Sequence, residues 1–255
     1  RTVTLSSTYT SVSLRMNLAS LITLSIGVAI IGCNIVLCIH NFALGKSASQ
    51  SSIFWDARYA VDGNTSGNNP TSSGTCSATK PTNSWVYHYW EVDIGFPVIV
   101  KNITIYGRTD QEDDQLSNFK IYLGNHSRSW TSNRQLSVES SGDNVYIINP
   151  ANSVAQFVSL RRQNNILTLC EVIVQGECLD GFYSDKCNQP CGKCYGPWPC
   201  DKETGECFKG CELGWKGKRC DQGCNVGTYS YGCNETCGNC LNGNLSCSKT
   251  DGQCL

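Results

Sequence analysis

The chain has 255 residues with 20 basic and 21 acidic side chains, so its formal net charge at pH 7 is −1. Such a balance supplies no positive field that would collect phosphates, and nucleic acid is not expected as a partner. Of the 18 cysteines, 14 follow residue 177, which indicates a protein that matures in an oxidising compartment.

The first 38 residues precede any domain. Residues 1–15 are rich in Ser and Thr and have no initiator methionine, so we treat them as upstream, non-domain sequence. Residues 16–38 are apolar and end at a plausible small-residue cleavage site, Val36-Leu37-Cys38. This pattern is typical of a secretory signal peptide; the apolar length of about 19 residues leaves an uncleaved signal anchor as the alternative. Both interpretations place the rest of the chain outside the cytosol.

Residues 41–176, the β domain, have the pattern of β-strands. Clusters of Gly, Asn, Asp and Ser separate short runs that are wholly apolar or alternate polar with apolar residues, namely 90–95, 98–106, 118–124, 144–149, 155–160 and 169–175. No stretch keeps a helical period for three turns. The sequence therefore predicts an all-β sandwich of about 135 residues, long enough to bury a core.

The cysteine-rich tail, residues 178–255, contains an internal repeat. Its cysteines recur at offsets of 46 or 47 residues, Cys178, Cys187, Cys191, Cys194, Cys200 and Cys207 matching Cys224, Cys233, Cys237, Cys240, Cys247 and Cys254. Between the copies lies the segment GCELGWKGKRC. We expect a first unit at 178–220 and a second, incomplete unit at 224–255, each too small to fold without cross-links.

The pairs CGKC and CGNC in the tail allow three interpretations. They could hold zinc as thiolates, form a redox-active pair, or belong to structural disulfides. Sixteen cysteines, an even number, remain when Cys33 and Cys38 are removed with the leader. The even number, the leader and the repeat favour structural disulfides.

The opening segments CLDGFYSDKC and CNVGTYSYGC, with their matched cysteines, glycines and aromatics, resemble laminin-type or scavenger-receptor-type EGF-like repeats. The resemblance implies a spacer held by a ladder of disulfides: Cys178 to Cys187, Cys191 to Cys200, Cys194 to Cys207, Cys211 to Cys220, Cys224 to Cys233, Cys237 to Cys247 and Cys240 to Cys254.

The β domain carries NFALGKSASQSS, AVDGN, a cysteine in a Ser/Thr-rich loop, WEVDIG, GRTD and LCEVIV in this order. This order resembles F-type lectins (fucolectins), relatives of the discoidin sandwich, over residues 41–176. The resemblance implies an eight-stranded jelly-roll β-sandwich whose loops bind sugar at one end and hold calcium nearby. It also implies a disulfide between Cys76 and Cys170.

The same resemblance implies a set of calcium ligands. They are the Tyr59 carbonyl, Asp62, Asn64, the Thr75 hydroxyl, the Cys76 carbonyl and Glu171. Each position carries an oxygen donor, the ligand type that calcium prefers. The alternative is a plain Asp-Gly turn with Glu171 as a solvated residue.

For the sugar itself, the family uses a histidine two residues after the loop cysteine and a segment of the form R-x-D-x4-R/K. Arg108 and Asp110 match this segment, whereas Ala78 occupies the histidine position and Gln115 the second basic position. A longer WVYHY segment could supply His88 or an aromatic as a replacement. Fucose binding, binding of another glycan, and a degenerate site in which Arg108 only pairs with Asp110 all stay open.

Further motifs bear on compartment and chemistry. The chain has three histidines, and its run of acids after Arg108 has the pattern of a solvated loop, so no enzyme is expected. Asn64 heads a sequon but is expected to stay unmodified because it is a proposed calcium ligand; glycosylation is expected at Asn102, Asn125, Asn234 and Asn244.

The sequence thus indicates an extracellular, calcium-dependent carbohydrate-recognition protein or the ectodomain of a scavenger-type receptor, with EGF-like repeats as a spacer. The alternative is an adhesion or matrix protein whose β domain binds a cell-surface protein and has a degenerate sugar site. A membrane would be engaged only through an uncleaved leader or a downstream span.

Overall fold

The computed structural model describes residues 40–67, 74–82, 86–110, 113–138, 144–163, 166–197, 200–240 and 246–254. The expected leader and Asn244 lie outside these residues. Within the described ranges, no helix has the length and apolar character needed to cross a membrane.

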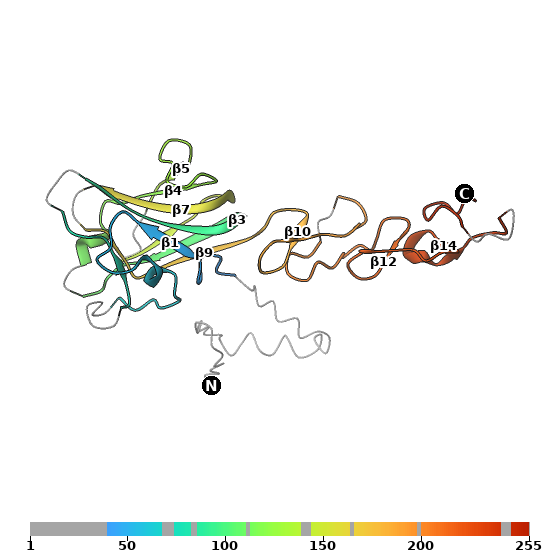
Figure 1. Ribbon diagram of the computed structural model, residues 1–255, viewed down its shortest axis with the longest axis horizontal. Coiled ribbons are helices and arrows are strands. Elements are labelled where there is room, and N and C mark those ends of the chain that lie inside the picture. The colour runs from blue at the N-terminus through green and yellow to red at the C-terminus, as the bar shows by residue number, and fades with distance from the viewer. Residues whose placement is uncertain are drawn as a thin grey trace, which may run out of the picture. The chain divides into compact units, whose positions relative to one another are not determined.

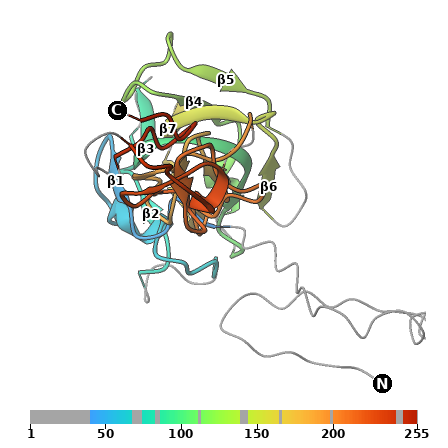
Figure 2. The same ribbon diagram turned by 90° about the vertical axis from the view of Figure 1, so that its right-hand side faces the viewer.

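The β domain is an antiparallel sandwich, as predicted (Figure 1). Its seven-stranded sheet follows the order β1 (Ser47–Gln50), β3 (Tyr87–Tyr106), β7 (Ser153–Gln163), β4 (Lys120–Gly124) and β5 (Arg134–Leu136), and β6 (Val145–Ile148) and β9 (Glu171–Cys178) also pair with β3. A separate pair joins β2 (Ser77–Ala78) to β8 (Thr168–Leu169). Figure 2 shows β4, β7, β3 and β1 after a 90° turn from the view of Figure 1.

Strand β3 unites two runs that the sequence analysis treats as separate. The runs 90–95 and 98–106 belong to one strand, which continues between them with a shift in register between Asp93 and Val98. Gly95 takes a φ of +92°, which glycine adopts without strain. Before the shift, β3 pairs with β1 and β7; after it, β3 pairs mainly with β9 and β6. One strand therefore connects most of the domain.

The core lies between these strands. Seven apolar residues of β3 are fully buried, together with apolar residues of β4, β7 and β9; those of β3 are Trp90, Val92, Ile94, Val98, Val100, Ile103 and Ile105. The indole Nε1 of Trp90 donates to the Ala57 carbonyl at 3.0 Å and fixes the short helix η2 (Ala57–Ala60) against the sheet. A second short helix, η3 (Asp113–Leu116), follows β3.

Among its described residues, the tail contains three ribbons of the same design. They are β10 (Phe182–Tyr183) with β11 (Gln189–Pro190), β12 (Trp215–Lys216) with β13 (Gln222–Gly223), and β14 (Thr228–Tyr229) with β15 (Glu235–Thr236); helix η4 (Tyr231–Cys233) lies within the third. Gly181, Gly214 and Gly227 occupy equivalent positions, each with a φ of +85°. The segment expected to lie between the two copies is thus itself a third ribbon.

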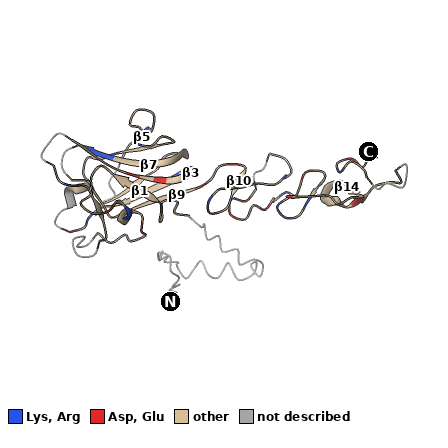
Figure 3. Ribbon diagram, in the orientation of Figure 1, with Lys and Arg blue, Asp and Glu red and all other residues tan. Residues whose placement is uncertain are grey.

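Eight disulfides join the same cysteine pairs that the two resemblances imply. One contact also repeats with the cysteines: the ring of Tyr183 covers Gly205, and the ring of Tyr229 covers Gly252. A Cβ atom at either glycine would lie 2.6 or 2.5 Å from the ring, so only glycine fits. Basic and acidic residues are interspersed along both regions (Figure 3).

Candidate functional site

Arg108 lies just after the end of β3, at a turn that is held by backbone hydrogen bonds. Asn144 Nδ2 donates to the Arg108 carbonyl at 2.8 Å, and the Gly107 amide donates to the Asn144 carbonyl at 2.8 Å. Thr109 donates its amide to the Gly67 carbonyl at 3.2 Å. The side chain of Arg108 is only 7% exposed, so its guanidinium is held at the surface of the packed domain rather than extended into solvent.

The Arg108 guanidinium is fixed by Asp110 and Gln115. Nε and Nη2 donate to the two oxygens of Asp110 at 2.8 and 2.6 Å, and Nη1 donates to Gln115 Oε1 at 3.1 Å. Thr168 Oγ1 donates to the same Gln115 oxygen at 2.6 Å. Each terminal nitrogen carries a second hydrogen that these bonds do not use. The bidentate ion pair thereby orients an arginine fork.

Ala78, the expected histidine position, lies beside this cluster. It is fully buried in β2, opposite Thr168 of β8. On its other side a β-bridge joins it to Trp55, with amide-to-carbonyl distances of 3.0 and 3.2 Å. The Trp55 ring centroid lies 5.8 Å from Arg108 Cζ. Trp55 is not among the residues predicted from the sequence; the signal that could have found it is the run of three apolar residues at 53–55, in a segment without strand periodicity.

His88 does not belong to a loop, because β3 begins one residue earlier. Its side chain is 2% exposed, and its Nε2 lies 3.2 Å from Thr82 Oγ1. Burial lowers the pKa of His88, and the positive charge of its cross-strand neighbour Arg162 lowers it further. This is a packed, neutral histidine whose hydrogen-bond partner is Thr82 rather than a member of the Arg108 cluster.

Glu171 forms a second polar site at the start of β9. It is fully buried, and its Oε2 accepts from the Gly63 amide at 3.1 Å. Its Oε1 has no hydrogen-bond partner among the described residues. Burial raises the pKa of Glu171 to about 7, although the Gly63 hydrogen bond opposes the shift. An unpartnered buried carboxylate oxygen is costly and is normally compensated by a cation or a proton.

The turn that faces Glu171 carries the other expected ligands. Asp62 Oδ1 accepts from the Asn64 amide at 2.9 Å, and Asn64 Oδ1 accepts from the Ser66 amide at 3.0 Å. Gly63 has a φ of +88°, which suits glycine at this turn. Tyr59 lies in η2, with its ring over Gly74. The structure thus brings the turn and Glu171 together.

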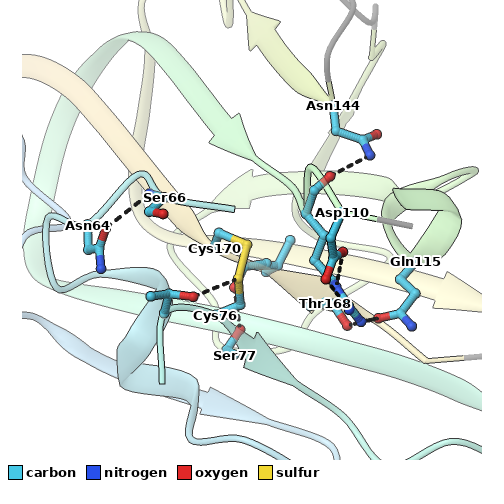
Figure 4. Close-up of a disulfide and its surroundings, with 12 residues drawn as sticks. Asn64, Ser66, Cys76, Ser77, Asp110, Gln115, Asn144, Thr168 and Cys170 are labelled. Carbon is cyan, nitrogen blue, oxygen red and sulfur yellow. Dashed lines mark hydrogen bonds and ion pairs between the residues drawn. A yellow bond between two sulfur atoms is a disulfide. The ribbon is translucent and has the colours of Figure 1, made fainter. Parts of the chain in front are cut away.

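The disulfide between Cys76 and Cys170 connects the two sites (Figure 4). Thr168 contacts the Arg108 cluster through Gln115, and Glu171 follows three residues later in the chain. Thr75 and Cys76, both buried, are bonded to this segment by the disulfide. One short segment therefore positions both sites.

The donors at the six expected ligand positions suit a hard cation. The six expected positions offer carbonyl, hydroxyl, amide and carboxylate oxygens, and only Asp62 and Glu171 are carboxylates. In the part of the chain that the structure describes, no group of three or more His, Cys, Asp and Glu side chains is placed to bind a metal ion. A site here would therefore rely on neutral oxygens for most of its ligands.

The expected glycosylation sites differ in their surroundings. Asn102 lies in β3, where its Nδ2 donates to Gln175 Oε1 at 3.0 Å. Asn125 is exposed, and its Oδ1 accepts from the Gln156 amide at 3.1 Å. Asn234 is exposed at the end of η4. Asn125 and Asn234 are the more accessible acceptors.

Residues 45–172 match the model of the F5/8 type C domain. The chain belongs to the F5/8 type C domain family. A fucose binding module from Streptococcus pneumoniae is 31% identical and has a TM-score of 0.46, with 54% of this chain and 95% of that one covered. The lectin domain of lectinolysin, complexed with Lewis B antigen, is 29% identical over 52% of this chain and 94% of its own, with a TM-score of 0.45.

A third solved structure is an f-lectin (fucolectin) from Morone saxatilis (striped bass) serum. It is 29% identical with a TM-score of 0.48, and the alignment covers 54% of this chain and 49% of that one. No curated protein matches this chain. Arg108 and Glu171, the central residues of the two sites, both lie within the F5/8 type C match.

Proposed function

We propose that the F5/8 type C domain is a calcium-dependent glycan-recognition module in which Arg108 holds the sugar. The observation that carries this proposal is the oriented arginine fork, held by Asp110 through two nitrogens and by Gln115 through a third. A fork of this kind can donate to two neighbouring hydroxyls of one sugar ring. Resemblance to F-type lectins, which bind fucose, supports the same ligand class.

Local charge favours a neutral ligand. Asp110 already neutralises Arg108 at 2.6 Å, so an anionic ligand would compete with a carboxylate that is held in place. A neutral polyol can accept hydrogen bonds from the fork without displacing Asp110. At the position where F-type lectins have a second basic residue, this chain has Gln115, whose side-chain amide can both donate and accept hydrogen bonds. This arrangement supports recognition of an uncharged sugar.

A glycan array on the calcium-loaded protein tests this function. We expect wild-type protein to bind a defined set of glycans, and both Arg108→Ala and Arg108→Lys to lose that binding, since lysine keeps the charge but not the fork. Arg134→Ala is the matched control, because Arg134 is exposed on β5 and bonds to Pro150 and Ser153 instead. A blank array from folded wild-type protein would favour a protein partner.

We also propose that calcium binds between Glu171 and the turn at 62–64. The unpartnered Glu171 oxygen supports this, because a cation would compensate its burial. Asp62, Asn64, Glu171, the Thr75 hydroxyl and the carbonyls of Tyr59 and Cys76 would hold it. Bound calcium would supply positive charge that holds the loop against the segment carrying Thr168, and thereby steady the Arg108 cluster.

Calorimetric titration of calcium into protein that has been freed of metal with a chelator tests calcium binding directly. We expect one site with a dissociation constant on the order of 0.1 mM, typical of extracellular modules. Glu171→Gln and Asp62→Ala should each abolish the heat. Asp180→Ala is the control, since Asp180 lies in the tail and pairs with Lys202. Titration heat that persists in Glu171→Gln would place calcium elsewhere.

We infer that the tail is an EGF-like, disulfide-braced spacer in an extracellular recognition protein. Its seven disulfides and three like ribbons support this role, because cross-links of this density are typical of proteins outside the cytosol. Deleting residues 178–255 should leave glycan affinity unchanged in the remaining domain. A loss of affinity would show that the tail contributes to the site.

A further inference from the structure

We propose that Trp55 is the surface on which the sugar stacks in the glycan site. Its indole would supply a sugar contact in place of the histidine that Ala78 replaces. The ligand would be a pyranose that presents vicinal hydroxyls to Arg108 and a continuous C–H face to the indole, as galactose and 6-deoxygalactose (fucose) do. This inference rests on the proposed function and names the residue that sets its specificity.

The backbone of Trp55 is fixed on both sides. Its amide donates to the Ala78 carbonyl at 3.0 Å, and its carbonyl accepts from the Ala78 amide at 3.2 Å and from Gln50 Nε2 at 2.8 Å. The next residue, Asp56, caps η2 by accepting from the Arg58 amide at 3.0 Å. Because both neighbouring segments are held, the indole is presented from a rigid support, which lowers the entropy lost on binding.

The position of the ring points to a ligand rather than to core packing. Trp55 is partly exposed, and the two residues before it, Ile53 and Phe54, are 63% and 53% exposed. Three consecutive apolar residues on a surface loop are unusual unless they serve binding. The ring is 5.8 Å from Arg108 Cζ, at the outer limit of a cation–π contact. The Phe54 ring also meets the indole edge to face, with ring centroids 5.1 Å apart. Trp55 is still partly exposed with both contacts in place.

The expected sugar preference follows from the absence of a hydrogen-bonding side chain at Ala78. A histidine would donate a hydrogen bond to the sugar, whereas alanine offers none, so selectivity shifts from hydrogen bonding to the apolar face. In galactose and fucose, the hydrogens on carbons 3, 4 and 5 lie on one face, whereas in glucose they alternate between faces. An indole beside an arginine fork should therefore prefer the galactose configuration over glucose.

Titration calorimetry of the full chain in calcium tests the inference, with the methyl glycosides of L-fucose, D-galactose and D-glucose as probes. We expect the first two to bind more tightly than the glucoside. Trp55→Ala should weaken them by about tenfold or more, the usual effect of losing a central aromatic contact, whereas Trp55→Phe should lose only about threefold. Indole fluorescence should change on titration in wild type but not in Trp55→Phe.

Trp130→Ala is the matched control, since Trp130 is a partly exposed tryptophan that packs on Tyr122 and Arg161 instead. Its affinity should equal that of the wild type. Wild-type affinity in Trp55→Ala, with binding lost in Arg108→Ala, would overturn the stacking role and leave the glycan function standing. Failure of folded wild type to bind any array glycan would instead overturn the proposed function, and the stacking role with it.

Discussion

In the β domain, apolar residues from Phe42 to Val174 form one continuous core, and a single disulfide closes it. Beyond Gly176, the buried apolar side chains among the described residues are all cysteines: Cys178, Cys200, Cys220, Cys224, Cys240 and Cys247. Burial of an apolar core stabilises the β domain, whereas disulfides take the place of a core in the tail. The candidate site lies in the first region, at loops that a rigid sandwich can position.

Reduction should separate the two regions most strongly. With all disulfides reduced, we expect the tail to lose its hydrogen-exchange protection completely, because no buried core remains to order it. The β domain should keep protected amides in β3, β7 and β9. Protected amides in the fully reduced tail would contradict this comparison.

The Cys76–Cys170 bond should have the next largest effect. Its cysteines are 94 residues apart, and a loop of this length stabilises by roughly 4 to 5 kcal/mol on the chain-entropy model. The double variant Cys76→Ser with Cys170→Ser should therefore unfold at much lower urea, followed by tryptophan fluorescence, yet still fold in water. A free energy of unfolding within about 1 kcal/mol of the wild type would show that the chain-entropy account fails here.

Calcium should contribute a smaller, pH-dependent amount. With a dissociation constant of about 0.1 mM, 1 mM calcium adds about 1.4 kcal/mol to the stability of the β domain. Chelation should therefore lower its melting temperature by a few degrees at pH 7. The same treatment should leave the tail unaffected.

The sign of the pH effect follows from Glu171, whose pKa rises from 4.5 to about 7 in the folded protein. Without metal, unfolding releases its proton between these values, so stability falls as pH rises from 4.5 to 7. Calcium needs the carboxylate, so its stabilisation should grow over the same range. Melting temperatures with and without calcium at pH 5, 6, 7 and 8 measure this. A calcium effect independent of pH, or unchanged in Glu171→Gln, would contradict the assignment.

The ribbons of the tail provide the smallest test. Ser230 has φ 76° and ψ −167°, a conformation that glycine alone adopts without strain, and the equivalent residue of the second ribbon is Gly217. Ser230→Gly should favour the closed Cys224–Cys233 bond by about 1 kcal/mol, roughly fivefold in a glutathione titration.

The reciprocal substitution Gly217→Ser should disfavour the Cys211–Cys220 bond by a similar factor. If both substitutions shifted the disulfide equilibrium in the same direction, the two ribbons would not be equivalent.

Much of the fold could be predicted because its causes are local. Alternation at 90–95 and 155–160 specified strands, and cysteine spacing specified the tail. The structure differs from the sequence-based expectation in two places: the runs 90–95 and 98–106 form one strand, β3, and the segment between the two repeat copies forms a third ribbon. The continuity of β3 depends on its pairing with β7 and β9, which are distant in sequence. The third ribbon is local, since Trp215 pairs with Gly223 and Cys211 with Cys220.

The site was partly predictable for the same reason. Arg108 and Asp110 are two residues apart, so their pairing could be expected from a short motif. Trp55 meets Ala78 through a backbone bridge across 23 positions, which no local pattern shows. Likewise, the unpartnered oxygen of Glu171 depends on how β9 packs behind the turn at Gly63.

The central claim is that Arg108 holds a sugar. A crystal structure of the calcium-loaded protein with the glycan that scores highest on the array tests it most directly. The account predicts two neighbouring hydroxyls of one ring within hydrogen-bonding distance of the terminal nitrogens of Arg108, with Asp110 still paired to it. A glycan bound at another surface, with Arg108 and Asp110 unchanged and untouched, would contradict it.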